Sequence, residues 1–531
     1  ESPRAGVGPN GCDGVLDGPT FICTEGWDWI PTVRDRCTGI WQDVVLHPTG
    51  PVALGDSKAV TALPKLPDLS VAEVTVQAEL RNLTAQPQRT TLIGTIAGAQ
   101  FEIAVTLQPL ETKTVTANPK EFPQLALKQP TLWWPNGYGE PTLHDFTLSA
   151  LDAAGKESDR TTQRVGLRLI TTTNAPQLVI SVNGRRVFCK GGNWGLDDMM
   201  KQVSKAKLEP YLRLERDANL TMIRNWCGQS TSEAFFQLCD EYGLLVYNDF
   251  WLSTADHNLP AIDADLFLAN AGDTVKRSRN HACIALWSGR NEGMPPTWIN
   301  QRLADLLQEL DGTRIYVPSS WNFPVAGGGP YHYSELKTYF ETAPKKPFNT
   351  ELGAYSVPTS DAMRAGLDPS QLWPIGDSWM YHESHAQSED YRKAIARNFG
   401  ESIDFDSFIR HAQMMNYDIH RAMFEAWSAR LWQPCSGVLL WMTHPTWLST
   451  VSQIYSHDYD THASYFAAKK ACEPIHIQWN LTDDNVVVVN NLFAPLNQAA
   501  VTVKIVDLDG RELEKRVVKL DAAPSAATVA T

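Results

Sequence analysis

The first third of the chain alternates apolar and polar residues. VAEVTVQAEL (71–80) and FEIAVTLQPL (101–110) place an apolar side chain at nearly every second position, and turn residues separate such stretches. Alternation with period two is typical of antiparallel strands that bury one face, as in a β-sandwich. We therefore expect a β-sandwich over residues 51–170.

After residue 170 the pattern changes to short apolar runs, several of them followed by amphipathic stretches. We interpret eight runs as strands, namely RRVFCKGG, LTMIRNW, GLLVYNDF, CIALWSG, RIYVPSS, PYHY, PFNTEL and GVLLWMTH. Eight strand–helix alternations within residues 171–472 predict a (β/α)8 barrel. The connections on either side of PYHY are short, so a helix is least clearly indicated there.

The stretches between the early strands have apolar residues at helical spacing. They are LEPYLRLERDAN, STSEAFFQLCDEYG, LFLANAGDTVKRSRN and INQRLADLLQEL, and SFIRHAQMMNYDIHRAMFEAWSARL lies in a longer insertion before the last strand. The second begins with serine and threonine residues that suit a helix cap. Residues 1–50 are rich in Gly, Pro and Trp and predict only the last strands of a β-sandwich. Residues 473–531 alternate again and predict a second sandwich.

Composition narrows the class of protein. In 531 residues, 43% hydrophobic and 20% charged residues are near the globular average, and no apolar run approaches the roughly 18 residues that a membrane span needs. The net charge of -14 repels phosphates and anionic lipids, which argues against nucleic acid and membranes as partners. Nine cysteines without a CxxC pair fit neither a disulfide framework nor a zinc ribbon. Cys12, Cys23 and Cys37 could form one bridge, whereas Cys189 and Cys227 are predicted core residues, as is Cys283.

Polar and aromatic side chains follow the predicted strands, at the end where such barrels carry their reactive groups. They are Asn193, Trp194 and Asp198 after the first strand, Arg224 and Trp226 after the second, Asp249 and Trp251 after the third, Asn291 and Glu292 after the fourth, His332 and Tyr333 after the sixth, Glu351 after the seventh, and Trp441, His444 and Trp447 after the eighth. We expect one rim to collect two glutamates, an arginine, amides and indoles.

Glu292 and Glu351 end the fourth and seventh predicted strands, on opposite sides of an eight-stranded barrel. Two carboxyl groups that face each other, one protonated and one ionised, are what cleavage of a glycosidic bond requires. The two glycines within SGRNEG, on either side of RNE, would let the chain pass close to a sugar, and Arg224 would hold Glu351 ionised through a charge-assisted bond. A single glutamate at a strand end is more often a cap or an ion pair, so the hypothesis depends on the pair.

The sequence indicates no metal or cofactor. YHESH (381–385) contains His382, Glu383 and His385, but its histidines are one residue closer together than in HExxH. The sequence contains no GxGxxG, P-loop or G-x-S-x-G motif. The expected chemistry therefore needs protein side chains only.

Six motifs follow one another in the order GWDWIPTVRDRCTGIWQDVVL, KGGNWGLDDMM, NLTMIRNWCGQ, NHACIALWSGRNEG, PFNTELG and AAKKACEPIHIQ. Together they resemble glycoside hydrolase family two, in the branch of β-mannosidases, plant-type endo-β-mannosidases and exo-β-D-glucosaminidases. The resemblance runs from about residue 20 to about residue 510. It implies a retaining enzyme with a jelly-roll sandwich, an immunoglobulin-like domain, the barrel and further immunoglobulin-like domains.

By this resemblance, SGRNEG places the acid/base at Glu292 and FNTELG places the nucleophile at Glu351. We expect the rest of the rim to bind the sugar, namely Asn193, Trp194, Asp198, Arg224, Trp226, Asp249, Trp251, Asn291, His332, Tyr333, Trp441 and Trp447. Exo-glucosaminidases typically carry an aspartate after a serine at the acid position, whereas here Glu292 follows Asn291. This difference favours a mannoside-type enzyme.

Three functions remain open after the sequence analysis. The first is a retaining hydrolase of β-mannosides, including the β-linked mannose of an N-glycan core. The second is an exo-β-D-glucosaminidase, because an acidic surface would attract a cationic chitosan oligomer. The third is a carbohydrate-binding protein on an inactive barrel. In each case the expected partner is a β-linked oligosaccharide or glycan.

The two ends of the chain depart from the family pattern. Only the last strands of the first sandwich are expected in residues 1–50, and the domain in 473–531 stops early. Either a second chain supplies the missing parts after cleavage, or the form is unusual or truncated. Three Asn-Leu-Thr sequons, at Asn82, Asn219 and Asn480, are interpreted as chance matches. The compartment is undecided, with a secreted, periplasmic or vacuole-like location favoured over the cytoplasm.

Overall fold

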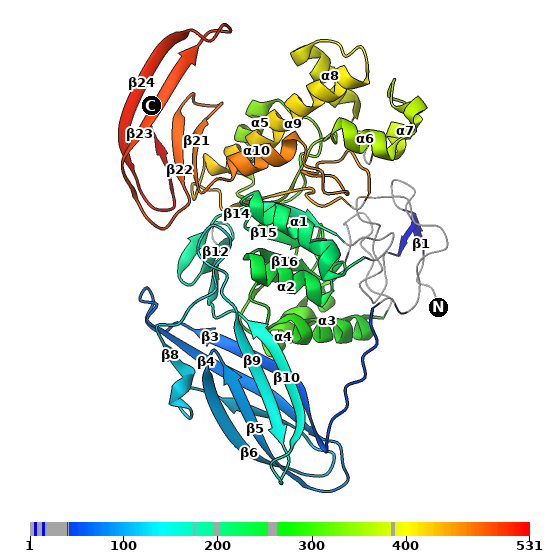
Figure 1. Cartoon of the computed structure of the whole chain (residues 1–531), viewed down its shortest axis with the longest axis vertical. Helices are drawn as coiled ribbons and strands as arrows, with labels where there is room; N and C mark the ends of the chain where they lie inside the picture. Colours follow the sequence, from blue (N-terminus) through cyan, green and yellow to red (C-terminus); the bar gives the residue numbers. More distant parts are fainter. Residues whose placement is uncertain are drawn as a thin grey trace.

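The computed structural model describes residues 5–7, 13–15, 40, 42–174, 176–195, 202–252, 263–383, 388–445 and 447–531. Figure 1 shows a β-sandwich at one end of the molecule, a barrel in the middle and a smaller set of strands at the opposite end. Most of the sandwich remnant predicted for residues 1–50 lies outside the described residues. Its described strands, β1 (Ala5–Val7) and β2 (Asp13–Val15), pair antiparallel. The predicted bridge among Cys12, Cys23 and Cys37 also lies outside them.

The first sandwich has two four-stranded sheets, as the alternation predicts. Its strands are β3 (Val52–Ala62), β4 (Val71–Asn82), β5 (Gln88–Ile96), β6 (Ala99–Leu107), β7 (Thr112–Ala117), β8 (Ala126–Lys128), β9 (His144–Leu151) and β10 (Glu157–Val165). One sheet has the order β10-β9-β5-β6, and in the other β4 pairs with β3, β7 and β8. The apolar residues of β4 alternate between buried and less buried positions, and they form a core with the facing sheet.

The barrel sheet contains seven parallel strands in the order β18-β17-β16-β15-β14-β20-β19. They are β14 (Cys189–Trp194), β15 (Met222–Asn225), β16 (Leu245–Asp249), β17 (Ile284–Ser288), β18 (Ile315–Val317), β19 (Phe348–Leu352) and β20 (Gly437–Leu440). Six of them fall within predicted strands, and β14 overlaps the first predicted strand but extends two residues beyond it. The fold is thus the predicted barrel with flanking sandwiches.

The prediction of a sixth strand at PYHY is wrong. Between β18 and β19 the described chain makes one parallel bridge, from Ala326 to Asn349. Gly328 and Gly329 have positive φ angles, and Pro330 has no backbone N–H to donate. This segment therefore cannot continue a regular ladder.

The prediction for the first strand is wrong in its first half. The residues of β13 (Arg185–Val187) belong to a separate antiparallel sheet with β11 (Ile170–Thr173) and β12 (Val179–Val182). The parallel barrel strand β14 begins only at Cys189. There Gly191 is required, because a Cβ on it would lie 1.6 Å from the carbonyl oxygen of Met222 on β15.

Helices occupy the five predicted amphipathic stretches and also further segments of the barrel. They are α1 (Lys205–Asp217), α2 (Glu233–Tyr242), α3 (Ala264–Ser278), α4 (Thr297–Leu310), α5 (Leu336–Thr342), α6 (Ser360–Gly366), α7 (Asp377–Tyr381), α8 (Ser388–Phe399), α9 (Phe405–Ser428) and α10 (Ala463–Ala471). Side chains of Ser204, Ser232 and Asp263 cap α1, α2 and α3. Helices α6 to α9 form the insertion between β19 and β20 and lie together on one side of the barrel (Figure 1).

The C-terminal strands form two small sheets. They are β21 (Ile475–Trp479), β22 (Val486–Asn490), β23 (Leu496–Val506), β24 (Glu512–Ala522) and β25 (Ala526–Val529). The sheet β21-β22-β25 faces the hairpin β23-β24 across a core that includes Val488, Val501 and Ala522. His476 on β21 lies 2.7 Å from a carboxylate oxygen of Glu425 on α9, which connects this domain to the barrel.

The sequon asparagines have structural roles in the fold. Asn82 is buried and its side chain donates to the carbonyls of Gln86 and Gln108, both at 2.7 Å. Asn219 donates to the carbonyl of Lys469, and Asn480 is buried. Amides that are engaged in this way are poorly placed for glycosylation, which agrees with chance matches. Cys189, Cys227 and Cys283 are buried and unbridged, as predicted.

A buried ion pair fixes the turn that leads from α3 into β17. The Nδ1 atom of His281 lies 2.6 Å from a carboxylate oxygen of Asp240 on α2, and Asp240 also accepts from the backbone N–H of Cys283. Burial alone would lower the pKa of His281, but the Asp240 carboxylate, aided by Glu233, raises it to about 9. His281 therefore carries its positive charge at neutral pH.

We expect His281→Gln to destabilise the barrel more at low pH than at high pH. A raised folded-state pKa stabilises the fold fully below the usual value near 6.5, and this contribution is lost as pH rises through about 9. The pH-dependent part is on the order of 3 kcal/mol. Thermal midpoints of wild type and variant should differ more at pH 6 than at pH 9.5. His332→Gln, at an exposed position, serves as control, and a difference that grows toward high pH would contradict the ion pair.

Candidate active site

The guanidinium of Arg224 connects four barrel strands at their carboxyl ends. Arg224 ends β15 and is 0% exposed. Its Nη1 donates to Glu351 Oε1 at 2.5 Å, and its Nη2 donates to Asp249 Oδ2 at 2.6 Å and to Asn291 Oδ1 at 2.7 Å. Side chains from β16, β19 and the end of β17 therefore converge on one cation, as the sequence predicts for Arg224 and Glu351.

Glu351 is nearly enclosed at the end of β19, with 4% of its surface exposed. Its Oε1 accepts from Arg224, and its Oε2 accepts from the hydroxyl of Tyr331 at 2.6 Å. A buried carboxylate needs such donors, because it has lost its hydration. The two contacts hold both oxygens and fix the plane of the carboxylate.

Tyr331 is a site residue that the sequence analysis missed. Burial raises the pKa of its hydroxyl well above the usual value, and the charges of Glu351 and Glu292 raise it further. The hydroxyl therefore stays protonated and acts as a donor. Arg224 binds Glu351 and also Asn291, the residue directly before Glu292, so both glutamates belong to the same end of the barrel. PYHY includes Tyr331, but its interpretation as a strand that ends at residue 333 led us to expect His332 and Tyr333 at the rim instead.

Glu292 lies just beyond β17 and is partly open to solvent. Its φ of 44° lies in the left-handed region, at a cost of about 1 kcal/mol for a residue with a Cβ, and Gly293 follows with a φ of 81°. The backbone N–H of Glu292 donates to Ser320 Oγ at 3.0 Å, which holds this conformation. The backbone turn therefore gives Glu292 a more accessible carboxylate than that of Glu351.

Asp249 lies at the end of β16 and is 1% exposed. It receives two donors of Arg224 and also the backbone N–H of Cys227 at 3.0 Å. Burial raises the pKa of Asp249, while Arg224 opposes the shift. Burial lowers the pKa of Arg224, but Asp249 and Glu351 outweigh this effect and raise it. Asp249 is therefore buried against Arg224, and little of its own surface is accessible to a ligand.

Two of the predicted indoles form a wall beside the glutamates. Trp226 and Trp441 meet edge to face with ring centroids 5.3 Å apart, and Tyr331 packs against their cluster. Two others are enclosed in the protein core. Trp194 is stacked on His444 at 3.8 Å, and Trp251 packs against Phe250 and Phe267.

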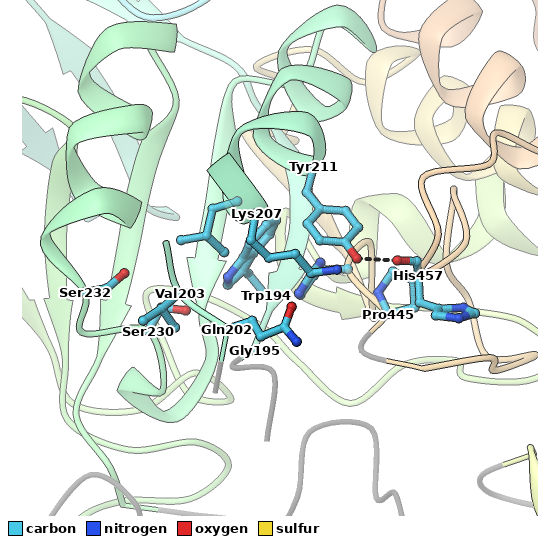
Figure 2. A pocket seen from close by; sticks show the side chains of 12 residues that line it. Trp194, Gly195, Gln202, Val203, Lys207, Tyr211, Ser230, Ser232, Pro445 and His457 are labelled. Atoms are coloured by element: carbon cyan, nitrogen blue, oxygen red, sulfur yellow. Dashed lines mark hydrogen bonds between the residues drawn. The ribbon is translucent and has the colours of Figure 1, made fainter. Parts of the chain in front are cut away.

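A small pocket opens beside Trp194, between β14, the start of α1 and the segment after β20 (Figure 2). It has about 450 Å³ of empty space, including open solvent, and is lined by side chains such as Lys207, Tyr211, Ser232 and His457. Burial lowers the pKa of His444, which also lines it, to about 3, and Lys207 contributes. Neither Glu292 nor Glu351 lines this pocket.

The remaining predicted residues lie in different surroundings. Asn193 is buried and donates to the carbonyls of Thr350 and Leu440, both at 2.9 Å. His332 is exposed, and the Tyr333 hydroxyl accepts from Arg397 on α8. The ring of Trp447 contacts His382.

Some predictions fall beyond the described residues or concern other kinds of site. Asp198 and His385 lie outside the described part of the chain. Among the described residues, no three or more His, Cys, Asp or Glu side chains are grouped so that they could hold a metal ion. Across the same residues, no helix is long and apolar enough to cross a membrane.

Comparisons with known proteins relate this chain to one family of enzymes. A family model described as "Glycosyl hydrolases family 2" matches residues 59–168, and one described as "Glycosyl hydrolases family 2, TIM barrel domain" matches residues 176–321. A mannosylglycoprotein endo-beta-mannosidase from Lilium longiflorum is 32% identical over 92% of this chain and 58% of its own length. An exo-beta-D-glucosaminidase from Streptomyces avermitilis is 31% identical over 93% of this chain and 58% of its own.

Solved structures give the same relationship. An exo-chitosanase from Amycolatopsis orientalis superposes with a TM-score of 0.83 at 26% identity, over 91% of this chain and 60% of that chain. A beta-D-mannosidase from Dictyoglomus thermophilum has the same fold, with a TM-score of 0.77 at 21% identity over 91% of this chain and 62% of that chain. The chain spans about 58% of the length of the curated relatives named above. By sequence and by fold, it belongs to glycosyl hydrolases family 2.

Proposed function

We propose that this protein hydrolyses β-mannosides with retention of configuration, with Glu351 as nucleophile and Glu292 as acid/base. The observation that carries the proposal is that Arg224 binds both Glu351 and Asn291, the residue directly before Glu292, which brings the two glutamates to one end of the barrel. Glu351 is buried and oriented by Arg224 and Tyr331, whereas Glu292 is accessible and acts on the same hydroxyl through its charge. Two carboxyl groups with such different surroundings suit the two roles of a glycosidase.

In the first step, Glu351 attacks the anomeric carbon while Glu292 gives its proton to the departing oxygen. This forms a covalent glycosyl-enzyme and releases the aglycone. In the second step, Glu292 takes a proton from water, which attacks the same carbon and frees Glu351. Arg224 and Tyr331 donate to the carboxylate of Glu351 and keep it aimed at the sugar. Because Glu292 is partly open to solvent, water can reach it for the second step, in which the glycosyl-enzyme is hydrolysed.

The orientation of Asn291 supports a mannoside over a glucosaminide. Its Oδ1 accepts from Arg224 and from Ser320 Oγ, and arginine can only donate, so the amide orientation is fixed. The Nδ2 group is then the part of the amide left for substrate, and it can only donate. A sugar 2-hydroxyl can accept such a bond, whereas the ammonium of glucosamine cannot. The endo-β-mannosidase relative agrees with this choice.

The second candidate is an exo-β-D-glucosaminidase acting on chitosan oligosaccharides. Relatives with this name, at 31% and 28% identity, and the net charge of -14 favour it. Hydrolysis of aryl β-mannoside and aryl β-glucosaminide should be compared under the same conditions. Activity on the glucosaminide alone would overturn the mannoside proposal, and no hydrolysis of any β-glycoside would favour a carbohydrate-binding protein.

Trapping with a 2-deoxy-2-fluoro β-mannoside should label Glu351. The fluorine slows both steps, and an activated leaving group restores the rate of the first step only, so the glycosyl-enzyme accumulates. Peptide mapping by mass spectrometry should find the label in PFNTELGAY (347–355). Glu351→Gln should remain unlabelled, and a label on any other peptide would refute the assignment of the nucleophile.

Glu292→Ala should slow hydrolysis according to the leaving group. For an alkyl or sugar aglycone, which needs protonation, we expect kcat/KM to fall by about 10²- to 10⁴-fold. A dinitrophenyl aglycone leaves without help, so its release should suffer much less, and added azide should yield β-mannosyl azide. Equal losses for both aglycones would show that Glu292 is not the acid.

Tyr331→Phe should lower kcat while leaving KM nearly constant. The variant removes one charge-assisted bond to Glu351, which is worth roughly ten- to a hundredfold in rate. The matched control is Tyr333→Phe, whose hydroxyl contacts Arg397 instead. A loss of similar size in both variants, or a change confined to KM, would contradict the positioning role.

A further inference from the structure

Three ring side chains lie together beyond the end of β20. The Trp447 ring lies over the imidazole of His382, with centroids 4.5 Å apart and planes at 35°. Tyr381 meets Trp447 edge to face at 5.6 Å. Tyr381 is 60% exposed and the other two are partly exposed, so the cluster presents ring surface to solvent. We call Tyr381, His382 and Trp447 the aromatic cluster.

The chain that carries Trp447 begins and ends beside the candidate active site. It leaves β20 at Trp441, which belongs to the indole wall, and returns at Val451 and Ser452. There Val451 bridges to Tyr355, and the Ser452 N–H donates to the Ala354 carbonyl at 2.8 Å. Both contacts lie three or four residues beyond Glu351. Trp447 therefore lies in a loop whose base borders the proposed nucleophile, and Tyr381 and His382 meet it from the end of α7.

Hydrogen bonds fix this cluster in position. The Nδ1 atom of His382, at the end of α7, lies 2.6 Å from the carbonyl oxygen of Leu448, which can only accept. The backbone N–H of Thr450 donates to the His382 carbonyl at 3.3 Å. Helix α7 of the insertion is thus tied to the loop after β20. A preordered ring surface binds a ligand at a lower entropic cost than flexible side chains do.

The aromatic cluster also lies next to the pocket of Figure 2. Burial lowers the pKa of His457, which lines that pocket, and Lys207 and His382 lower it further. Pro445 also lines the pocket and lies two residues before Trp447, so the pocket and the aromatic cluster share one segment of the chain.

The position of the cluster indicates which part of a substrate it faces. The leaving group must lie against Glu292, because that residue protonates its oxygen. Glu292 follows β17, whereas the cluster is carried by the segment after β20 and by the insertion that precedes it. In the sheet order these strands are separated by β16, β15 and β14. The cluster therefore faces the glycone, away from the leaving group.

We propose that Tyr381, His382 and Trp447 bind a second sugar, attached to the non-reducing side of the mannose whose bond is cleaved. This inference rests on the proposed function and extends it to the substrate class. Flat ring faces suit the C–H faces of a sugar, and a tyrosine hydroxyl and an imidazole supply polar contacts. The substrate class is then a β-mannoside whose mannose carries a further sugar, which corresponds to endo action.

The test compares two aryl glycosides with the same leaving group, one of β-mannose and one of β-mannose that carries another mannosyl residue. For Trp447→Ala and Tyr381→Ala, the ratio of kcat/KM for the extended over the simple substrate should fall roughly two- to tenfold. Trp479→Ala is the matched control, because Trp479 is 58% exposed on β21 in a different domain. The ratio should not change in this control.

An unchanged ratio in both cluster variants would overturn the inference, even if wild type hydrolyses β-mannosides. If wild type shows no hydrolysis, calorimetric titration of the same proteins with the free mannosyl disaccharide replaces kinetics. Weaker binding by Trp447→Ala than by Trp479→Ala would then support the second-sugar site while the proposed reaction fails. Equal binding by the two variants would overturn the inference independently of the reaction.

Discussion

The site depends on one buried cation, the guanidinium of Arg224. A charge that is removed from water is tolerated only when other charges and hydrogen bonds replace its hydration. Asp249 and Glu351 supply the negative charges, and Asn291 supplies a further acceptor. Because these groups come from separate strands, the ion cluster sets the relative positions of the strand ends. Removing one partner would leave an uncompensated charge in the barrel.

The surroundings of the two glutamates follow from this cation and from the backbone. Glu351 ends a regular strand, so its side chain is delivered into the enclosed cluster and held by two donors. Glu292 lies one step beyond its strand, in a left-handed conformation that Ser320 stabilises. The same barrel end therefore carries one enclosed and one accessible carboxyl group. This asymmetry is the physical basis for assigning them different roles.

Several features were predictable because local sequence determines them. Period-two alternation in the sandwich and apolar strand runs in the barrel give the order of elements, and Ser204 and Ser232 mark helix starts. Arg224 as the partner of Glu351 was also predictable, since both end predicted barrel strands and carry opposite charges. Tyr331 was not. The glycines and Pro330 before it break the strand pattern, so the phase of side chains in this segment could not be derived from periodicity.

The sequence by itself determined the architecture, the family resemblance and the two glutamates as candidates, because these depend on periodicity and short motifs. The tertiary structure decided which neighbours serve them. It put Trp226 and Trp441 in one wall and enclosed Trp194 and Trp251 in the core. It also brought α7 against the segment after β20, more than 60 residues away. Contacts of this kind depend on how distant segments pack, which no local pattern of residues encodes.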